Sequence, residues 1–199
     1  MKESKSLPFV YLASRSPRRV ELLNQIGVRC ESLPADIDES QHLGESPLNY
    51  VRRLSVEKAQ ACWNGLSDEK KIHPILAADT TVVLNGMVLG KPDDEVDAHR
   101  MLTALSGTLH EVHTAVALIF KNKTEVLVSS TVVEMMVMSE VQIQMYIASG
   151  EPVDKAGSYG IQGHAGSWIK RIEGSYSGVM GLPVFETAEL LRKVGLGIL

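Results

Sequence analysis

Apolar positions along the chain occur either as short continuous runs or at helical spacing. Phe9–Ala13 and Ile75–Ala78 are short apolar runs, which are typical of buried strands. Asp79 interrupts the second run, and Thr80–Leu84 continues as a strand up to the two-residue hairpin signal Asn85–Gly86. Further strands are predicted for Met87–Leu89, His110–Phe120 and Glu125–Met138, with a turn at Lys121–Asn122–Lys123 between the last two.

Helix signals lie between these strands. Ser16–Pro17 and Ser46–Pro47 each place a capping serine before a proline, which predicts helices that end at Ile26 and near Gly65. Three more helices are predicted from Asp93 or Asp94 to Leu105, from Ser139 to Gly150 and from Pro183 to Val194. Strands and helices mixed in this order, without regular strand–helix–strand alternation, indicate an α/β or α+β fold around a mixed sheet.

The composition limits the possible classes of protein. The length of 199 residues predicts one domain over residues 1–199, with a core of about 9–194. A net charge of −4 argues against a general nucleic-acid binder, and no apolar run is long enough to span a membrane. Cys30 and Cys62 form no CxxC pair, so we expect a reduced, cytoplasmic protein.

Two clusters of residues carry candidate chemistry. Arg18 and Arg19 stand in a first helical turn, where cations oppose the helix dipole. With Ser14 and Ser16 they would bind a phosphate group. The alternative is that the two arginines are a solvated surface pair. Asp79 is predicted at the end of a strand, where a buried carboxylate is costly without a partner. A catalytic or metal-binding role is favoured there over a turn.

Other polar residues give weaker signals. Lys91 stands between glycine and proline, where it would point a charge into a cleft or lie exposed in a loop. The stretch from Gly157 to Gly181 holds seven of the 16 glycines and predicts tight turns. His110 and His113 fall on opposite faces of a strand, so they are not expected to bind a metal together.

Taken in order, the motifs resemble the Maf family of nucleotide pyrophosphatases. The longest match is Leu12–Leu23, LASRSPRRVELL. It is followed by Ala78–Asp79–Thr80, Gly90–Lys91–Pro92, Leu105–Ser106–Gly107, Asp154–Gly157, Tyr159–Gly163 and Gly181–Leu182–Pro183. The resemblance covers about Phe9 to Leu191, nearly the whole chain.

The resemblance implies hydrolysis of nucleoside triphosphates to the monophosphate and pyrophosphate, with a divalent cation, Mg²⁺ or Mn²⁺. It implies an α/β fold with a mixed, mostly antiparallel twisted sheet flanked by helices, and two lobes around a deep cleft, as in Maf and ITPase-like proteins. A homodimer and an association with septum formation are also implied. The implied anion-binding residues are Ser14, Arg18, Arg19, Lys58 and Lys91; Glu39 and Asp79 would hold the metal, and Asp79 would accept the proton of the attacking water.

Three positions separate branches of the family, and here they are Arg18, Thr80 and Gln162. This combination is similar to the dTTP/UTP pyrophosphatase branch, whereas the 7-methyl-GTP branch carries Trp, Gln and Glu. Gln162 offers a donor and an acceptor, which suits a neutral pyrimidine edge. His164 departs from the family pattern and would alter specificity if it lined the base pocket.

Two other functions stay open on the sequence. One is a non-catalytic nucleotide-binding regulator of cell division, which needs the phosphate cradle but not Asp79. The other is a pyrophosphatase for purine or 7-methyl-GTP-type nucleotides. In each case the expected partner is a nucleoside triphosphate, not a nucleic-acid polymer or a membrane.

Overall fold

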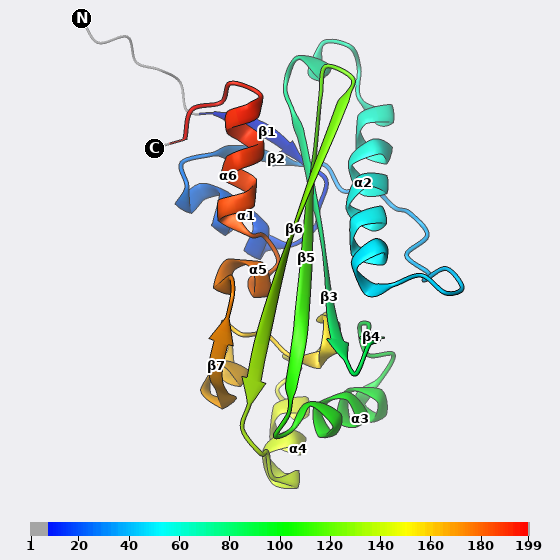
Figure 1. The fold of residues 1–199 in the computed structure, drawn as a ribbon, viewed down its shortest axis with the longest axis vertical. Coiled ribbons are helices and arrows are strands. Elements are labelled where there is room, and N and C mark those ends of the chain that lie inside the picture. The colour runs from blue at the N-terminus through cyan, green and yellow to red at the C-terminus, as the bar shows by residue number, and fades with distance from the viewer. Residues whose placement is uncertain (1–7, 199) are drawn as a thin grey trace, which may run out of the picture.

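The computed structural model describes residues 8–198. Its backbone is a seven-stranded twisted sheet whose three longest strands run along the long axis of the molecule (Figure 1). The strands are β1 (Phe9–Leu12), β2 (Arg29–Ser32), β3 (Ile75–Leu84), β4 (Met87–Leu89), β5 (Leu109–Phe120), β6 (Lys123–Met135) and β7 (Ile169–Glu173). The helices are α1 (Pro17–Gln25), α2 (Pro47–Gly65), α3 (Glu95–Leu105), α4 (Glu140–Ala148), α5 (Tyr176–Met180) and α6 (Val184–Lys193), with 3₁₀ turns at Lys70–Ile72, Ala156–Ser158 and His164–Trp168.

The sheet is mixed and mostly antiparallel, as predicted. Its order is β2-β1-β3-β5-β6-β7, and β4 pairs with β3. The pairings of β1 with β2 and with β3 are parallel, whereas every other pairing is antiparallel. The β5–β6 hairpin turns through Lys121 and Asn122, which both have positive φ, as a tight two-residue turn requires.

Helices cover both faces of the sheet in one half of the molecule. Successive residues of a strand point to opposite faces. Ile75 and Ala77 of β3 pack with α2, whereas Leu76 and Ala78 pack with α1 and α6. Figure 1 shows α2 on one side of the long strands and α1 with α6 on the other.

The other half of the molecule has a separate core. Here α3 and α4 pack beneath the far ends of the long strands (Figure 1). Leu102 and Leu105 of α3, Ile143 and Tyr146 of α4 and Val133 of β6 are buried together. The capping box of Ser139 and Gln142 starts α4 where the serine predicts it. The two lobes that the resemblance implies are therefore present.

The structure contains three elements that the sequence patterns did not predict: β2, β7 and α5. Residues of β2 and β7 are largely exposed, so their sequences carry no apolar run. The strand predicted to reach Met138 ends at Met135, beside a register shift in its pairing with β7 at Glu134 and Met135. The Met138 amide then donates to the Ser106 hydroxyl at 2.7 Å.

The two histidines of β5 lie on opposite faces of the strand, as predicted. His110 Nε2 lies 2.7 Å from the Tyr159 hydroxyl, and its Nδ1 has no hydrogen-bond partner within the described chain. His113 instead bonds Ser130 at 2.9 Å and pairs with Glu111 at 3.1 Å. Burial lowers the pKa of His110 to about 4.

Helix α6 offers a stability test with a control on the same helix. Leu190 is fully buried, whereas Phe185 is 70 % exposed. We expect Leu190→Ala to lower the free energy of unfolding by about 2–5 kcal/mol, and Phe185→Ala to change it by less than about 0.5 kcal/mol. Urea denaturation measures both, and equal effects of the two variants would contradict the packing of α6 described here.

His110 predicts a pH dependence of stability. Its pKa is lowered from 6.5 to about 4 in the fold, so the unfolded chain binds the proton first. The stability from this group is complete above pH 6.5 and is lost as pH falls toward 4. We expect the fall in urea midpoint from about pH 7 to pH 5 to be smaller in His110→Gln than in the wild type. The exposed His42→Gln should keep the wild-type fall; an unchanged His110→Gln profile would refute the prediction.

Candidate active site

A gap in the strand pairing opens the cleft between the lobes. On one edge, β3 pairs with β1 at Ile75 and Leu76 and with β4 at Val82–Leu84. Between them, Ala77–Thr81 has no strand partner on that edge within residues 8–198. A cleft of about 900 Å³ lies here, a volume in the range of small-molecule sites. It is lined by the β1–α1 turn, the Glu39 loop, α2, β3 and the 154–162 segment.

The sequence pattern predicted Asp79 at the end of a strand. In the structure it lies in the middle of β3. It pairs with Ala115 across the continuous β3–β5 ladder, and only 7 % of the residue is exposed. The prediction failed because an aspartate is unfavourable inside a strand. By alternation, Asp79 faces α2 and Thr80 faces α1.

Lys58 of α2 partners the buried carboxylate. Its Nζ lies 2.6 Å from Asp79 Oδ1 and 2.8 Å from Glu39 Oε1, so it joins the two acids predicted to bind metal. Burial raises the pKa of Asp79, although the charge and hydrogen bond of Lys58 oppose the rise. For Glu39, burial also raises the pKa, but Lys58, Lys91 and Arg19 outweigh it, and the pKa is lowered.

Arg19 is fixed at the opposite wall of the cleft. Its Nε donates to the Gly181 carbonyl at 2.8 Å, and Nη1 donates to the Ser14 hydroxyl at 3.0 Å. Nη2 lies 3.4 Å from Thr80 Oγ1, which is itself 3.0 Å from Thr114 Oγ1. Desolvation lowers the pKa of Arg19. A guanidinium fixed in this way can bind the oxygens of an anion through charge-assisted hydrogen bonds.

The cleft also contains Arg18, Lys91 and Gln162, so all nine predicted site residues line it. Lys155 donates to the backbone carbonyl of Glu151 and does not pair with Asp154. The His164 ring does not line the cleft, but bonds Glu151 outside it at 2.7 Å.

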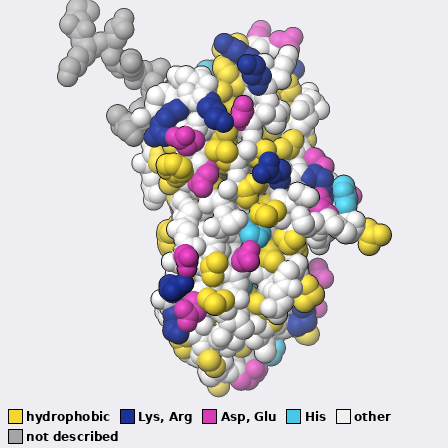
Figure 2. Space-filling view, viewed as in Figure 1, with side chains coloured by type: hydrophobic (Ala, Val, Ile, Leu, Met, Phe, Trp, Pro, Cys, Tyr) yellow, Lys and Arg dark blue, Asp and Glu magenta, His cyan; other side chains and the backbone are white. Residues whose placement is uncertain are grey.

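Basic groups outnumber acidic groups in the cleft, although the whole chain is acidic. Six cations line it, against Glu39, Asp79, Asp93 and Asp154. On the face shown in Figure 2, by contrast, basic and acidic side chains are interspersed. The excess of positive charge in the cleft therefore favours the binding of a small polyanion.

Comparison with known proteins agrees with the family resemblance of the motifs. Residues 9–194 match the family model described as Maf-like protein. The chain belongs to the Maf family. Among curated relatives, a protein of Methylobacillus flagellatus named dTTP/UTP pyrophosphatase is 54 % identical over 95 % of this chain and 94 % of its own. One of Nitrosomonas europaea with the same name is 50 % identical over 95 % and 96 %.

The Ham1 protein of Staphylococcus aureus shows a weaker structural likeness. It is 15 % identical, with a TM-score of 0.47, over 64 % of this Maf-family chain and 71 % of that one. This is too remote to support an inference about fold or function. Within residues 8–198, no helix is long and apolar enough to cross a membrane.

The carboxylates of this Maf-family cleft fit a cation that enters with a phosphate ligand. Glu39 and Asp79 converge on one point, now held by the Lys58 ammonium. Nowhere in residues 8–198 do three His, Cys, Asp or Glu side chains cluster to hold a metal. Mg²⁺ is commonly bound by one or two carboxylates together with substrate phosphates, and this donor set matches that arrangement.

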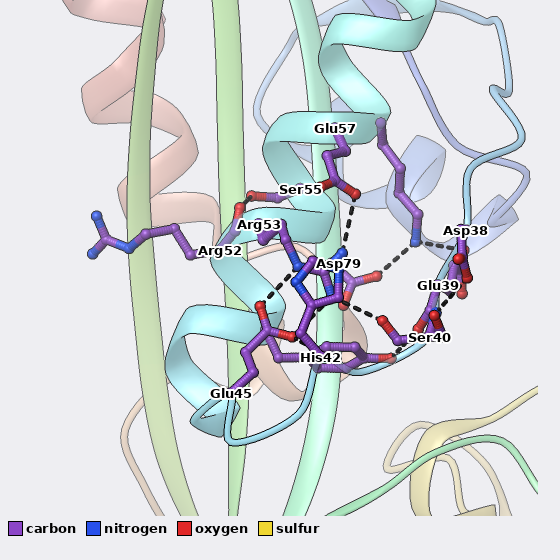
Figure 3. A network of polar contacts seen from close by, with 12 residues as sticks. Asp38, Glu39, Ser40, His42, Glu45, Arg52, Arg53, Ser55, Glu57 and Asp79 are labelled. Carbon is purple, nitrogen blue, oxygen red and sulfur yellow. Dashed lines mark hydrogen bonds and ion pairs between the residues drawn. The ribbon is translucent and has the colours of Figure 1, made fainter.

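The sequence patterns missed the residues that hold the Glu39 loop against α2. Arg53 makes a bidentate pair with Glu45 at 2.7 and 2.8 Å and donates to the Ser40 carbonyl at 2.9 Å. The Tyr50 hydroxyl donates to the carbonyl of Glu39 itself at 2.8 Å. Figure 3 shows this network between the loop and α2, with the Arg52 side chain pointing away from it. Tyr50 and Arg53 are about one turn apart on a predicted helix. This spacing could have indicated that both side chains contact the same neighbouring segment.

Replacing Arg53 tests how the loop is held. We expect Arg53→Lys to speed hydrogen exchange of the His42 and Glu45 amides about fivefold or more, because lysine lacks the bidentate fork. The neighbouring Arg52→Lys, whose side chain is exposed and leaves the network, is the matched control. Exchange rates that rise equally in both variants, or in neither, would contradict the assigned role.

Proposed function

We propose that this protein hydrolyses UTP and dTTP to the monophosphate and pyrophosphate. One observation carries the proposal: a buried carboxylate, Asp79, is paired with Lys58 in a cleft with a basic lining. The curated relatives named dTTP/UTP pyrophosphatase, at 50–54 % identity over nearly their whole length, support the substrate.

The triphosphate would bind along the basic wall of the cleft. Arg19 and Ser14 stand beside the free N-terminus of α1, whose first turn carries no acidic residue. Backbone N–H groups at a helix N-terminus and guanidinium groups both bind phosphate oxygens. Arg18 and Lys91, on the cleft lining, would complete the clamp and stabilise the charge on the departing pyrophosphate.

Water must attack the α-phosphorus while the bond from that phosphorus to the α–β bridging oxygen breaks, and this oxygen leaves with the pyrophosphate. Asp79 would accept a proton from the attacking water, and burial makes its carboxylate a stronger base by raising its pKa. Lys58 donates to Oδ1 of this carboxylate at 2.6 Å and so holds the group in a fixed orientation. A carboxylate held by a short charge-assisted bond loses little freedom in the reaction.

Glu39 and Asp79 would hold the divalent cation, Mg²⁺ or Mn²⁺. When bound, the cation neutralises phosphate charge that the basic side chains leave uncompensated. The Tyr50 and Arg53 contacts keep Glu39 facing the cleft. The cation itself is part of the proposal.

The base would lie at the end of the cleft formed by Gln162. Its side-chain amide offers one donor and one acceptor, which complement the neutral edge of uracil or thymine. Thr80, tied to Arg19 and Thr114, fixes the neighbouring wall. The cytoplasmic location and the homodimer remain predictions of the sequence.

Asp79→Asn tests the proposed chemistry. We expect wild type with Mg²⁺ to release pyrophosphate from UTP and dTTP, and the variant to lose about 10²–10⁴-fold in kcat, the usual contribution of a general base. The exposed Asp68→Asn should match wild type. Chelation with EDTA should stop turnover and added Mg²⁺ restore it.

Each alternative predicts a different pattern in this assay. Cleavage of purine or 7-methyl nucleotides alone would replace the substrate assignment and keep the chemistry. Nucleotide binding without any cleavage by wild type would favour a regulatory protein. A fully active Asp79→Asn would remove the assigned proton acceptor.

A further inference from the structure

Gln162 projects from a short turn that is closed by one backbone hydrogen bond, from the Gly163 N–H to the Gly160 carbonyl at 3.0 Å. It lies between Gly160 and Gly163, after the short 3₁₀ turn Ala156–Ser158, and it is exposed to the cleft. A side chain that reads a substrate edge needs a fixed backbone, and the glycines at both ends of this turn give the chain extra conformational freedom. Contacts from outside the turn therefore matter for the position of Gln162.

The Glu151 side chain holds the segment on its C-terminal side. Its Oε2 accepts the backbone N–H of His164 at 3.1 Å and lies 2.7 Å from His164 Nδ1. The carboxylate is close enough to the backbone that a Cβ at Gly163 would lie 1.9 Å from Oε1. Gly163 therefore packs directly on the carboxylate, one residue after Gln162.

The same carboxylate holds the N-terminal side through Tyr146. The Tyr146 hydroxyl donates to Glu151 Oε1 at 3.0 Å and accepts the Gly160 N–H at 3.1 Å. Tyr146 is 3 % exposed and belongs to the core of α4, so the chain of hydrogen bonds ends on a rigid element. Gln162 is thus flanked by two bonded backbone amides: Glu151 accepts the His164 N–H directly, and the Gly160 N–H bonds the Tyr146 hydroxyl that Glu151 orients.

The backbone of Glu151 adds a third contact. Its carbonyl accepts from Lys155 Nζ, and a Cβ at Gly160 would lie 2.9 Å from Lys155 Cε. Lys155 and Arg18 both line the cleft, and burial together with the charge of Arg18 lowers the pKa of Lys155. The Glu151 side chain itself is 16 % exposed. Burial raises its pKa, but the bonds from His164 and Tyr146 outweigh this and lower it.

We propose that Glu151 is a positioning residue for base recognition: it fixes the backbone on both sides of Gln162 and so sets the selectivity for uracil and thymine. This inference rests on the proposed function. Glu151 is outside the cleft lining and touches none of the residues proposed to bind phosphate or activate water. Glu151 is therefore expected to affect recognition of the base and not the rate of the hydrolysis step.

Glu151→Gln is the direct test. Glutamine keeps an acceptor for Tyr146 but presents an amide N–H₂ group to the His164 backbone N–H, so one side of the segment is released. The assay measures kcat and KM for UTP and for CTP, which present opposite donor and acceptor patterns. We expect the UTP-to-CTP ratio of kcat/KM to fall about fivefold to tenfold, through a higher KM for UTP, with kcat within about twofold of wild type.

Glu140→Gln is the matched control. Glu140 is also a residue of the α4 region that pairs with a histidine, His99, at 2.9 Å, but it lies on the surface and away from the cleft. This variant should keep the wild-type ratio. An unchanged ratio in Glu151→Gln, or an equal loss of kcat for both nucleotides, would overturn the proposal.

A second pair of variants keeps the proposal testable if Glu151→Gln does not fold. His164→Ala removes the side-chain contact to Oε2 and leaves Tyr146 in place, so a smaller fall in the ratio is expected. His164→Asn supplies an N–H donor near the Nδ1 position and should restore selectivity. Equal ratios in wild type, His164→Ala and His164→Asn would count against Glu151 acting through this contact.

The design separates this proposal from the proposed function. If wild type cleaves neither UTP nor dTTP, the enzymatic function fails. The positioning role is then measured by calorimetric binding of UTP and CTP to wild type and Glu151→Gln. Unequal loss of affinity for UTP supports Glu151, and equal affinities overturn it.

Discussion

The site depends on one buried ion pair, that of Asp79 with Lys58. A carboxylate in the middle of a central strand loses its hydration, and burying it without a partner costs several kcal/mol. The Lys58 ammonium, 2.6 Å away, supplies the compensating charge. Lysine can reach it only because α2 packs on the face of the sheet to which Asp79 points. Helix α2 therefore buries apolar residues of β3 and also supplies the cation that the buried Asp79 needs.

The shape of the sheet explains why this buried pair lines the cleft. Strand β3 is paired along β5, but its other edge is open between β1 and β4. Residues near this opening can reach the cleft from both faces of the strand. Asp79 and Thr80 are neighbours in the chain and yet join different walls, one with Lys58 and the other with Arg19.

Separate networks hold the two ends of the cleft. Arg53 and Tyr50 tie the Glu39 loop to α2, beside the residues proposed to act on the phosphates. Glu151 and Tyr146 tie the Gly160–Gly163 segment to α4, in the other lobe. Because the networks share no residue, either end of the cleft can be altered without removing the contacts that hold the other end.

The sequence by itself determined most helices, the long strands, the family resemblance and the set of residues that line the cleft. Capping serines, prolines, hairpin glycines and apolar spacing are local signals, and they were sufficient for α2, α4 and β5. Only the tertiary structure placed Asp79 inside a strand, directed His164 to Glu151 and built β2 and β7 from largely polar residues. The contacts that fix these features join residues from 13 positions apart, Glu151 and His164, to 41 positions apart, Val132 and Glu173. No local sequence pattern encodes the position of such a partner.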